Sequence, residues 1–420
     1  MDVTDTYNGT WYWRTETANR RHAMLWQPSL SDRYLSMTDD QLVAAVRARR
    51  AELGDDLVIL GHHYQQDEVF AFADFTGDSF KLSQLAAEQV QKVGARYVIF
   101  CGVHFMAQSA DVLTPEGTVV ILPDMSAGCS MADMADYEDT VDAWEQLHEV
   151  IDADTRVIPI CYMNSSAAIK AFCGEHGGAV CTSSNCDTVF DWALAGGTEP
   201  KCEGERIQIL FLPDEHLGRN TAAAMGHDPV TQMCVWDPKD PAGLGGLDAD
   251  DLMRCTFILW KGHCSVHMLF RAEHVDEIRA QWPDVNVIVH PECRYEVAQM
   301  ADMVGSTEGI RQAIETAEPG TRWSIGTEVH MVHRLAQEAA QRGVTARILS
   351  ECQCLCTTMY RIDLPHLLWV MDELVQGRVV NQISVPPHVK HWALIALNRM
   401  LELAGSGTIK SASPAESRSA

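Results

Sequence analysis

The chain has 420 residues, of which 46% are hydrophobic and 21% are charged, the proportions of a globular protein with room for two or three domains. Its 32 basic and 58 acidic residues give a net charge of −26, which argues against a nucleic-acid or anionic-membrane partner because both require a positive contact surface. A small anionic substrate stays compatible with this charge, since hydroxyl groups, glycines and helix N-termini bind anions without net basicity.

The cysteine content indicates a reducing compartment. No N-terminal segment has the build of a secretory signal, and no apolar run approaches the ~20 residues that a membrane span needs. Fourteen cysteines in such a chain are interpreted as free thiols, metal ligands or redox groups before disulfides. We therefore expect a cytoplasmic protein with neither a membrane nor a nucleic-acid partner.

Helix and strand signals begin after an N-terminal extension, residues 1–36. Thr38-Asp-Asp-Gln41 has the pattern of a capping box, which predicts a helix from this point. Residues 56–64 then form a continuous apolar run that ends in polar side chains, as expected of a buried parallel strand. Such runs alternate with helical patterns along the chain, so the fold class is predicted to be α/β.

This strand pattern occurs three times, which is the strongest signal in the sequence. Each unit has a strand ending in two polar side chains one residue apart, a turn rich in Gly or Ser, another strand, and then a cysteine. His62 and Cys129 are 67 residues apart in the first unit, and His290 and Cys356 are 66 apart in the third. The polar pairs are His62 with Tyr64, Tyr162 with Asn164, and His290 with Glu292.

The second unit is longer, because 100 residues separate Asn164 from Cys264. The excess lies in residues 226–254, whose Gly, Asp and Pro content indicates a surface insertion. We interpret the chain as three related βα units around a pseudo-threefold axis. The carboxyl ends of their strands would face a shared centre, where open α/β folds bind their ligands.

Cys129, Cys264 and Cys356 stand at the same place in their units, which favours one shared site over three separate buried thiols. Three thiolates could hold zinc with an open fourth position, or a [4Fe–4S] cluster with one iron free of protein ligands. The third ligand lies in the run Cys352-Gln-Cys354-Leu-Cys356, where the spacing favours Cys356. The other two cysteines of this run are interpreted as spare ligands or a redox pair.

The polar pairs would surround one pocket and supply proton transfers, with Glu292 as acid or base and His62 and His290 as hydrogen-bond donors to substrate. Three hydroxyl-bearing segments precede predicted helices, either as ordinary N-caps or as a site for carboxylates or phosphate. These segments contain Ser79, Ser183 and Ser306-Thr307. His263 and His267 flank Cys264 and are expected to orient groups around it.

Nine ordered motifs carry a family resemblance over residues 56–370. They are His62-His-Tyr64, Gly77-Asp-Ser79, Pro123-Asp-Met-Ser-Ala-Gly-Cys129, Tyr162-Met-Asn164, Cys181-Thr-Ser-Ser-Asn185, Gly262-His-Cys264, His290-Pro-Glu292, Gly305-Ser-Thr307 and Ile325-Gly-Thr-Glu328. Together they resemble the quinolinate synthase family. The resemblance implies three Rossmann-like α/β/α domains, a [4Fe–4S] cluster, and condensation of iminoaspartate with dihydroxyacetone phosphate to quinolinate, with loss of phosphate and water, on the route to NAD.

By position, the resemblance implies cluster ligation by Cys129, Cys264 and Cys356, and acid–base roles for Tyr64 and Glu292. It implies substrate contacts for His62, Ser79, Tyr162, Asn164, Ser183, His290 and Thr307. It also implies a functional link to an L-aspartate oxidase or dehydrogenase as the source of iminoaspartate. Two alternatives stay open, namely a zinc-dependent aldolase or hydrolase on the same thiolates, and a non-catalytic iron–sulfur metabolite sensor.

The expected domain division follows the three units. The first α/β domain is predicted to combine residues 37–131 with 357–404, the second to span 132–265, and the third to span 266–356. Residues 405–420 are predicted to be a disordered tail, because their Gly/Ser-rich composition cannot form a packed core.

Overall fold

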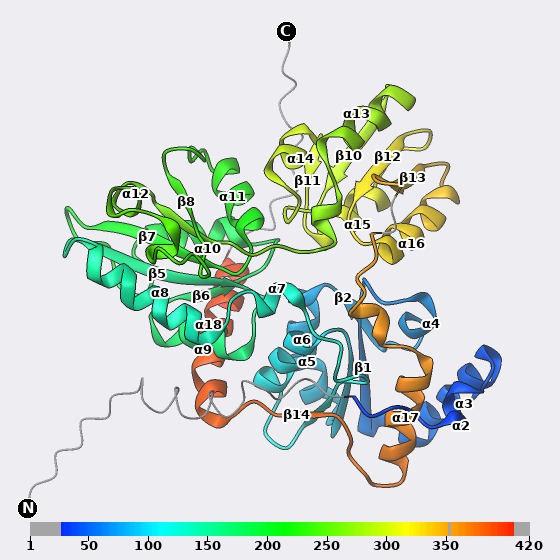
Figure 1. The fold of residues 1–420 in the computed structure, drawn as a ribbon. Coiled ribbons are helices and arrows are strands. Elements are labelled where there is room, and N and C mark those ends of the chain that lie inside the picture. The colour runs from blue at the N-terminus through cyan, green and yellow to red at the C-terminus, as the bar shows by residue number, and fades with distance from the viewer. Residues whose placement is uncertain (1–26, 352–353, 407–420) are drawn as a thin grey trace, which may run out of the picture.

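The apolar runs of the sequence form the inner strands of three separate sheets with helices around them (Figure 1). The computed structural model describes residues 27–351 and 354–406. The α/β class predicted from the alternation of strand and helix patterns is confirmed, since every strand pair is parallel except one at a sheet edge.

The first sheet has the strand order β14-β4-β3-β1-β2, and β14 is its antiparallel edge strand. All six residues of β1 are buried, because helices cover both faces of a parallel sheet and leave no strand face in water. The strands are β1 (Leu57–His62), β2 (Phe75–Gly77), β3 (Tyr97–Cys101), β4 (Val119–Ile121) and β14 (Gln382–Ile383). The helical segments that accompany them are α3 (Asp39–Leu53), η1 (Gly54–Asp56), α4 (Asp67–Phe70), α5 (Ser79–Val93), α6 (His104–Leu113) and α7 (Ser130–Asp133).

The second sheet has five parallel strands in the order β6-β5-β7-β9-β8. Its edge strand β8 lies in the stretch 226–254, so the expectation of a surface insertion is wrong for this part: Trp236 is buried and pairs with Trp260. The strands are β5 (Thr155–Tyr162), β6 (Ala179–Cys181), β7 (Arg206–Leu212), β8 (Met233–Trp236) and β9 (Phe257–Trp260). The helical segments are α8 (Tyr137–Val150), α9 (Ala167–Glu175), α10 (Cys186–Leu194), α11 (Glu215–Ala224), η2 (Leu244–Gly246) and α12 (Ala249–Arg254).

The third sheet has four parallel strands in the order β11-β10-β12-β13. Separate apolar clusters cover its two faces, whereas the first and second sheets share one continuous core. The strands are β10 (Val285–Val289), β11 (Met303–Val304), β12 (Arg322–Gly326) and β13 (Thr345–Ile348). The helical segments are η3 (His267–Leu269), α13 (Ala272–Gln281), α14 (Tyr295–Met300), α15 (Thr307–Glu315) and α16 (Val329–Ala340).

The three sheets repeat one strand order, which matches the three units of the sequence. In each sheet the first strand of the unit (β1, β5 or β10) lies between the second strand (β2, β6 or β11) and the third strand (β3, β7 or β12). The second strand is an edge strand in all three sheets. The turn after the first strand is also shared: His63 donates its amide to Gly77, and Met163 donates its amide to Cys181. The polar pairs therefore leave their strands at equivalent places.

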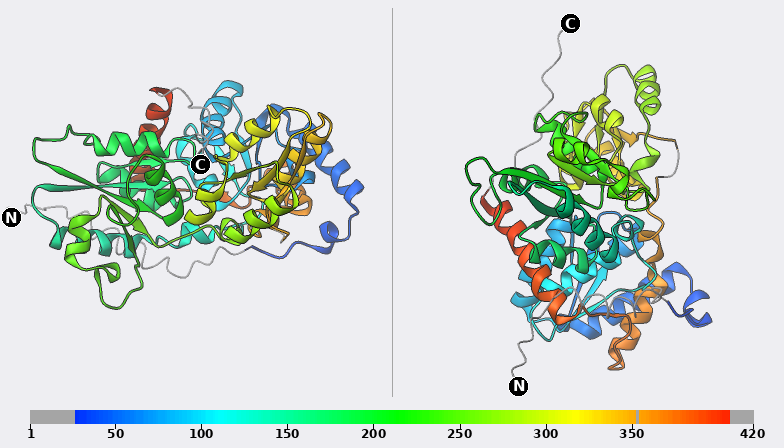
Figure 2. Two further views of the ribbon diagram at one scale, coloured as in Figure 1. Left: turned by 90° about the horizontal axis from the view of Figure 1, so that it is seen from above. Right: turned by 60° about the vertical axis from the view of Figure 1, so that its left-hand side comes forward.

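The two ends of the described chain pack on different sheets. The predicted capping box opens α3, where Thr38 Oγ1 accepts from the Gln41 amide and Gln41 Oε1 accepts from the Thr38 amide. Within the expected extension, residues 27–36 contain α2 (Asp32–Leu35), and the rest lies outside the described part. After η4 (Met359–Arg361), α17 (Leu364–Val375) packs on α3, whereas α18 (Pro387–Ser406) lies along α9 and β6 (Figure 2). The predicted tail beyond Ser406 lies outside the described residues.

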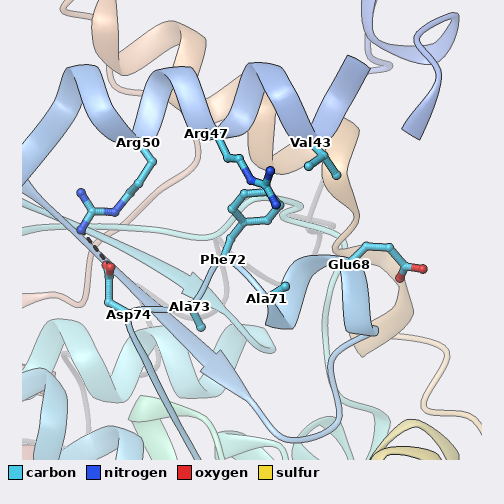
Figure 3. Close-up of a pocket in the computed structure, with 8 residues that line it drawn as sticks. All are labelled: Val43, Arg47, Arg50, Glu68, Ala71, Phe72, Ala73 and Asp74. Carbon is cyan, nitrogen blue, oxygen red and sulfur yellow. Dashed lines mark hydrogen bonds and ion pairs between the residues drawn. The ribbon is translucent and has the colours of Figure 1, made fainter. Parts of the chain in front are cut away.

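Two further features concern the surface. No helix among the described residues is both long and apolar enough to cross a membrane. A surface pocket lies between α3 and the segment 68–74 (Figure 3), where Arg50 forms a 2.8 Å ion pair with Asp74. Its lining residues lie on α3, on α4 and in the segment between α4 and β2, and none of them belongs to the polar pairs.

Candidate active site

Two histidines at equivalent strand ends have the same local geometry. The Tyr64 amide donates to His62 Nδ1 at 3.1 Å, and the Glu292 amide donates to His290 Nδ1 at 3.3 Å. Burial lowers the pKa of His62 well below its ordinary range and lowers the pKa of His290 to about 3. Both rings are therefore neutral and, because Nδ1 accepts, carry their proton on Nε2. Each ring therefore supplies one N–H donor.

Glu292 is the most connected of these groups. The Tyr162 hydroxyl donates to its Oε1 at 2.6 Å, and His267 Nδ1 donates to its Oε2 at 2.8 Å. The His267 ring also stacks on the His290 ring, with centroids 4.5 Å apart. Burial raises the pKa of Glu292, but the two imidazoles and the two hydrogen bonds outweigh it and bring the pKa to about 2. Glu292 is thus a buried carboxylate.

Tyr64 joins this cluster from the first sheet. Its hydroxyl lies 2.8 Å from Thr327 Oγ1 and 3.2 Å from Thr307 Oγ1. Burial and the charge of Glu292 raise the pKa of Tyr64 well above its ordinary range, so the phenol keeps its proton. Thr327 Oγ1 in turn lies 3.1 Å from His267 Nε2.

A continuous hydrogen-bonded chain therefore crosses all three sheets. Glu292 accepts from His267 Nδ1, His267 Nε2 lies within hydrogen-bond distance of the Thr327 hydroxyl, and that hydroxyl lies within hydrogen-bond distance of the Tyr64 hydroxyl. Tyr162 ends the chain at the other oxygen of Glu292. Every member is buried or nearly so, and such enclosed chains strengthen each bond through polarisation.

The predicted hydroxyl groups differ in their roles at the helix ends. Ser306 caps α15 by accepting from the Gly309 amide, so the Thr307 hydroxyl is left for Tyr64. For α5 the cap is Asp78, which accepts from the Lys81 amide at 2.8 Å, so Ser79 is the first helical residue and its interpretation as an N-cap is wrong. Ser183 is half-buried in the turn between β6 and α10 and does not cap the helix either.

Asn164 has a buried side-chain oxygen without a partner. Among the described residues, no hydrogen-bond donor reaches Asn164 Oδ1. Such an orphan costs about 1–3 kcal/mol in a protein interior, and native structures rarely retain one unless a ligand or water satisfies it. Its place two residues after Tyr162 supports the predicted substrate contact.

The three predicted cysteine ligands each follow the last strand of their unit. Cys129 and Cys264 are half-buried after β4 and β9, and Cys356 is half-buried after β13, where its Sγ lies 3.4 Å from Thr358 Oγ1. Burial raises the pKa of all three thiols, to about 12 for Cys129, and a Cys356 thiolate would raise the pKa of both Cys129 and Cys264 further. The three sulfurs thus lie in one electrostatic neighbourhood.

Comparison with known proteins agrees with this arrangement. The family described as quinolinate synthetase A protein matches residues 44–402. The quinolinate synthase of Acidobacterium capsulatum is 54% identical over 374 residues, which cover 89% of this chain and 96% of that protein. Those of Nocardioides sp. and Streptomyces coelicolor are 51% and 49% identical, each over 88% of this chain and about 90% of their own length. The chain belongs to the quinolinate synthetase A family.

The thiols present fit the iron–sulfur cluster that this family implies. A buried thiolate is unstable without a compensating cation, so three thiols with raised pKa values suit a metal centre that binds them deprotonated. Three thiolates suit either zinc with an open fourth position or a [4Fe–4S] cluster with one iron free of protein ligands.

Cys352 and Cys354 are the alternatives to Cys356 as the third cysteine ligand of the cluster. Cys354 is completely buried in the core of the third sheet, and its carbonyl accepts from the Val329 amide. Cys352 lies outside the described residues. Cys264, His267 and Glu292 have donor atoms within 4.8 Å of one another, the one group in the described part of the chain that is spaced for a single ion.

Three residues have contacts or burial that the sequence interpretation did not assign to them. Thr327 had no role of its own in the motif Ile325-Gly-Thr-Glu328, and His267 was expected only to orient groups around Cys264, yet both bond within the polar cluster. Asp214, to which no chemistry was assigned, is wholly buried beside the cluster, and the charge of Glu292 helps to raise its pKa. The available signals were the positions of Thr327 and Asp214 just after apolar strands and the spacing of His267 from Cys264.

Proposed function

We propose that this protein is a quinolinate synthase, which condenses iminoaspartate with dihydroxyacetone phosphate to quinolinate, with loss of phosphate and water, in the biosynthesis of NAD. The observation that carries the proposal is the 54% identity to a quinolinate synthase over nearly the whole of both chains. The hydrogen-bonded chain from Tyr64 to Tyr162 supports it, because a condensation with loss of water needs several proton transfers.

The proposed architecture places the three sheets around a pseudo-threefold axis with the active site at its centre. The shared strand order supports this arrangement, as do hydrogen bonds between the sheets: Arg334 Nη1 donates to the Gln65 carbonyl, and Asn220 Nδ2 donates to the Pro291 carbonyl. We keep the three expected domains as part of the proposal, with α18 reaching across to α9 of the second.

The proposed cofactor is a [4Fe–4S] cluster held by Cys129, Cys264 and Cys356. When bound, a cluster with one iron free of protein ligands supplies a Lewis acid for a substrate oxygen or nitrogen. The 54% identity to a quinolinate synthase over most of the chain argues against the zinc-dependent aldolase or hydrolase. The buried chain of acid–base groups argues against a non-catalytic sensor, which has no use for them.

The protein side chains divide into donors and one acceptor. His62 and His290 present Nε2–H donors to oxygen atoms of the substrates, and Tyr162 and Asn164 contact substrate from the second sheet. Ser79, Ser183 and Thr307, at or near helix N-termini, suit the carboxylate and phosphate groups. Because no lysine or arginine bonds to the described cluster, neutral donors carry most of this anion recognition.

Tyr64 and Glu292 are the proposed acid and base. The phenol of Tyr64 is protonated and Glu292 is ionised, so each begins in the state that its role requires. Thr327 and His267 connect the two groups through hydrogen bonds, which hold the acid and the base in fixed positions.

The proposed partners are the two small substrates and, functionally, an L-aspartate oxidase or dehydrogenase that supplies iminoaspartate. The reactive nature of an imine in water favours a short path between the two enzymes. The cysteine content supports a cytoplasmic location.

The test is anaerobic purification followed by iron and sulfide analysis, a visible spectrum, and an assay for quinolinate from the two substrates. Wild type is compared with Cys129→Ala, Cys264→Ala and Cys356→Ala. Cys354→Ala is the matched control, because this buried thiol lies two residues from the proposed ligand. We expect about four irons per chain in wild type and the control, loss of the cluster in the other three variants, and quinolinate formation only where the cluster is present.

Three results would contradict the proposal. Wild type that carries its cluster but forms no quinolinate would overturn the proposed activity. A cluster that survives Cys356→Ala but not Cys354→Ala would move the third ligand, and zinc in place of iron would overturn the cofactor.

A further inference from the structure

Asp214 is a buried carboxyl group at the same sheet edge as Tyr162 and Asn164. It follows β7, which pairs in parallel with β5, and Cys161 lies opposite Leu212 in that pairing. Tyr162 and Asp214 therefore leave neighbouring strands within two residues of the last paired position. The side chain of Asp214 is fully buried, so its polar atoms depend on the protein or a ligand for partners.

The two carboxyl oxygens of Asp214 differ in their partners. Asp214 Oδ1 caps α11 by accepting from the Leu217 amide at 2.8 Å. Among the described residues, Oδ2 has no hydrogen-bond partner, and neither does Asn164 Oδ1 on the neighbouring strand. These two buried oxygens without partners lie at one sheet edge, beside the Tyr162–Glu292 hydrogen bond. They indicate a site where a bound ligand supplies the missing hydrogen bonds.

The helix that follows Asp214 is fixed to the Glu292 loop. Asn220 Nδ2 on α11 donates to the carbonyls of Pro291 and Cys293, at 2.7 Å each, on either side of Glu292. These two hydrogen bonds hold the carboxyl groups of Asp214 and Glu292 near each other, away from solvent. Burial and the charge of Glu292 raise the pKa of Asp214 well above its ordinary range, which favours the protonated form of Asp214 beside an ionised Glu292.

A protonated Asp214 has the chemistry that an anionic substrate needs. Its Oδ1 is occupied by the helix cap, so the proton resides on Oδ2 and the unpartnered atom is a donor. An ionised carboxylate at this position would repel a dicarboxylate, whereas a neutral carboxyl binds one of its oxygens.

We propose that Asp214 is a further substrate-binding residue of this site, whose Oδ2 hydroxyl donates a hydrogen bond to a carboxylate oxygen of the small dicarboxylate substrate and of the product. This assignment rests on the proposed function, because quinolinate and iminoaspartate are both dicarboxylates.

The experiment separates the two roles of Asp214, which are to cap α11 through Oδ1 and to donate a hydrogen bond to substrate through Oδ2. Asp214→Ser keeps an N-cap of similar strength but is too short to place a donor at Oδ2. Asp214→Asn keeps the cap through Oδ1 and places an N–H donor where Oδ2 stands. Asp248→Ala is the matched control, because Asp248 caps α12 at the surface by accepting from the Asp251 amide at 2.8 Å. For all four proteins, with the cluster loaded, quinolinate binding is measured by calorimetry, KM and kcat by quinolinate formation, and folding by thermal unfolding.

The Asp214→Ser variant is expected to bind quinolinate roughly 10- to 100-fold more weakly than wild type, the loss typical of a buried hydrogen bond to a charged group. Its KM for iminoaspartate rises by a similar factor. Asp214→Asn recovers at least tenfold of this loss, and Asp248→Ala binds as wild type does.

The assignment is overturned if folded Asp214→Ser binds quinolinate as tightly as wild type, or if Asp214→Asn loses as much affinity as Asp214→Ser. These results differ from failure of the proposed function, in which loaded wild type itself forms no quinolinate.

Discussion

Tyr162 donates a 2.6 Å hydrogen bond to Glu292 Oε1, and this bond joins the end of β5 in the second sheet to the loop after β10 in the third. The other oxygen of Glu292 accepts from His267, which leads through Thr327 to Tyr64 of the first sheet. Each sheet therefore contributes part of one polar chain. Loss of any member leaves a buried neighbour unpaired, which costs more than the bond itself contributes.

Tyr162→Phe removes the hydroxyl without changing the shape of the ring. We expect kcat/KM for quinolinate formation to fall at least tenfold, because Glu292 loses a donor that helps to hold its pKa low and the substrate loses a contact. Steady-state assays of the cluster-loaded enzymes measure this change.

Tyr34→Phe is the matched control for this change. Tyr34 is another buried tyrosine, whose hydroxyl donates to Asp372 Oδ2 at 3.0 Å far from the candidate site. It is expected to lose stability but keep kcat/KM. Full activity of Tyr162→Phe, or equal losses in the two variants, would contradict a role for the Tyr162–Glu292 bond in the reaction.

Glu292 should make the protein sensitive to acid. Its pKa is about 2 in the folded protein against an ordinary value of 4.5, so its contribution is complete above pH 4.5 and is lost as the pH falls toward 2. Between pH 5 and 3 this group alone should lower the free energy of unfolding by about 2 kcal/mol. Urea denaturation at both pH values, for wild type and Glu292→Gln, measures the difference.

Glu292→Gln is expected to lose less stability than wild type over this range, because the substituted side chain does not titrate. Glu338→Gln is the control, since Glu338 is exposed on α16 and should follow wild type. The same acid response in wild type and Glu292→Gln would show that the carboxylate is not stabilised as described.

The sequence predicted the elements and the polar pairs because both depend on local patterns. The capping box at Thr38 and the buried run of β1 need only neighbouring residues to be recognised, and the repeat placed His62 and His290 at equivalent strand ends. In the described structure the same strand order recurs in all three sheets, which is the physical basis of that repeat.

The contacts between sheets could not be predicted in this way. His267 and Thr327 meet only because the third sheet packs against the loop that follows Cys264, and no spacing within a unit encodes that packing.

Two local features were also missed. The strand β8 was missed because its four residues lie among Gly, Asp and Pro, whose turn propensity dominates a local interpretation. The Asp78 cap was missed because Asp78 and Ser79 are both good cap formers.

Gly262 allows a close backbone approach beside the candidate site. A Cβ atom at this position would lie 2.1 Å from the Pro213 carbonyl oxygen, so Gly262→Ala must push apart the segments that carry Asp214 and Cys264. We expect a loss of roughly 2–4 kcal/mol in unfolding free energy, in the range of other steric insertions into packed backbone, and a lower iron content. Chemical denaturation and iron analysis measure both.

Gly405→Ala is the control for Gly262→Ala. Gly405 lies in α18, and no described atom lies within 4 Å of the place that a Cβ atom would take, so alanine should be neutral or stabilise the helix by up to about 1 kcal/mol. A Gly262→Ala protein with wild-type stability and iron content would mean that the Pro213 contact relaxes freely.

Arg334 on α16 holds the loop that carries Tyr64. Its guanidinium donates to the carbonyls of His63 and Gln65 and to Asp67 Oδ1, and it lies 4.2 Å from the Phe70 ring centroid. Arg334→Met keeps a long apolar side chain but removes every donor. We expect stability to fall by about 1–3 kcal/mol and kcat/KM to fall with it, because Tyr64 and His62 lose their fixed positions relative to Thr327.

Arg322→Met is the matched control for this last change. Arg322 also combines an ion pair, 3.0 Å to Asp284, with an aromatic neighbour, since its guanidinium lies 5.7 Å from the Trp282 ring centroid. It is exposed at the far end of β12, where an ion pair contributes little, so activity should not change. If Arg322→Met impairs quinolinate formation as much as Arg334→Met, the loss reflects general destabilisation. If only Arg334→Met does so, the arginine positions the loop from the first sheet against the third.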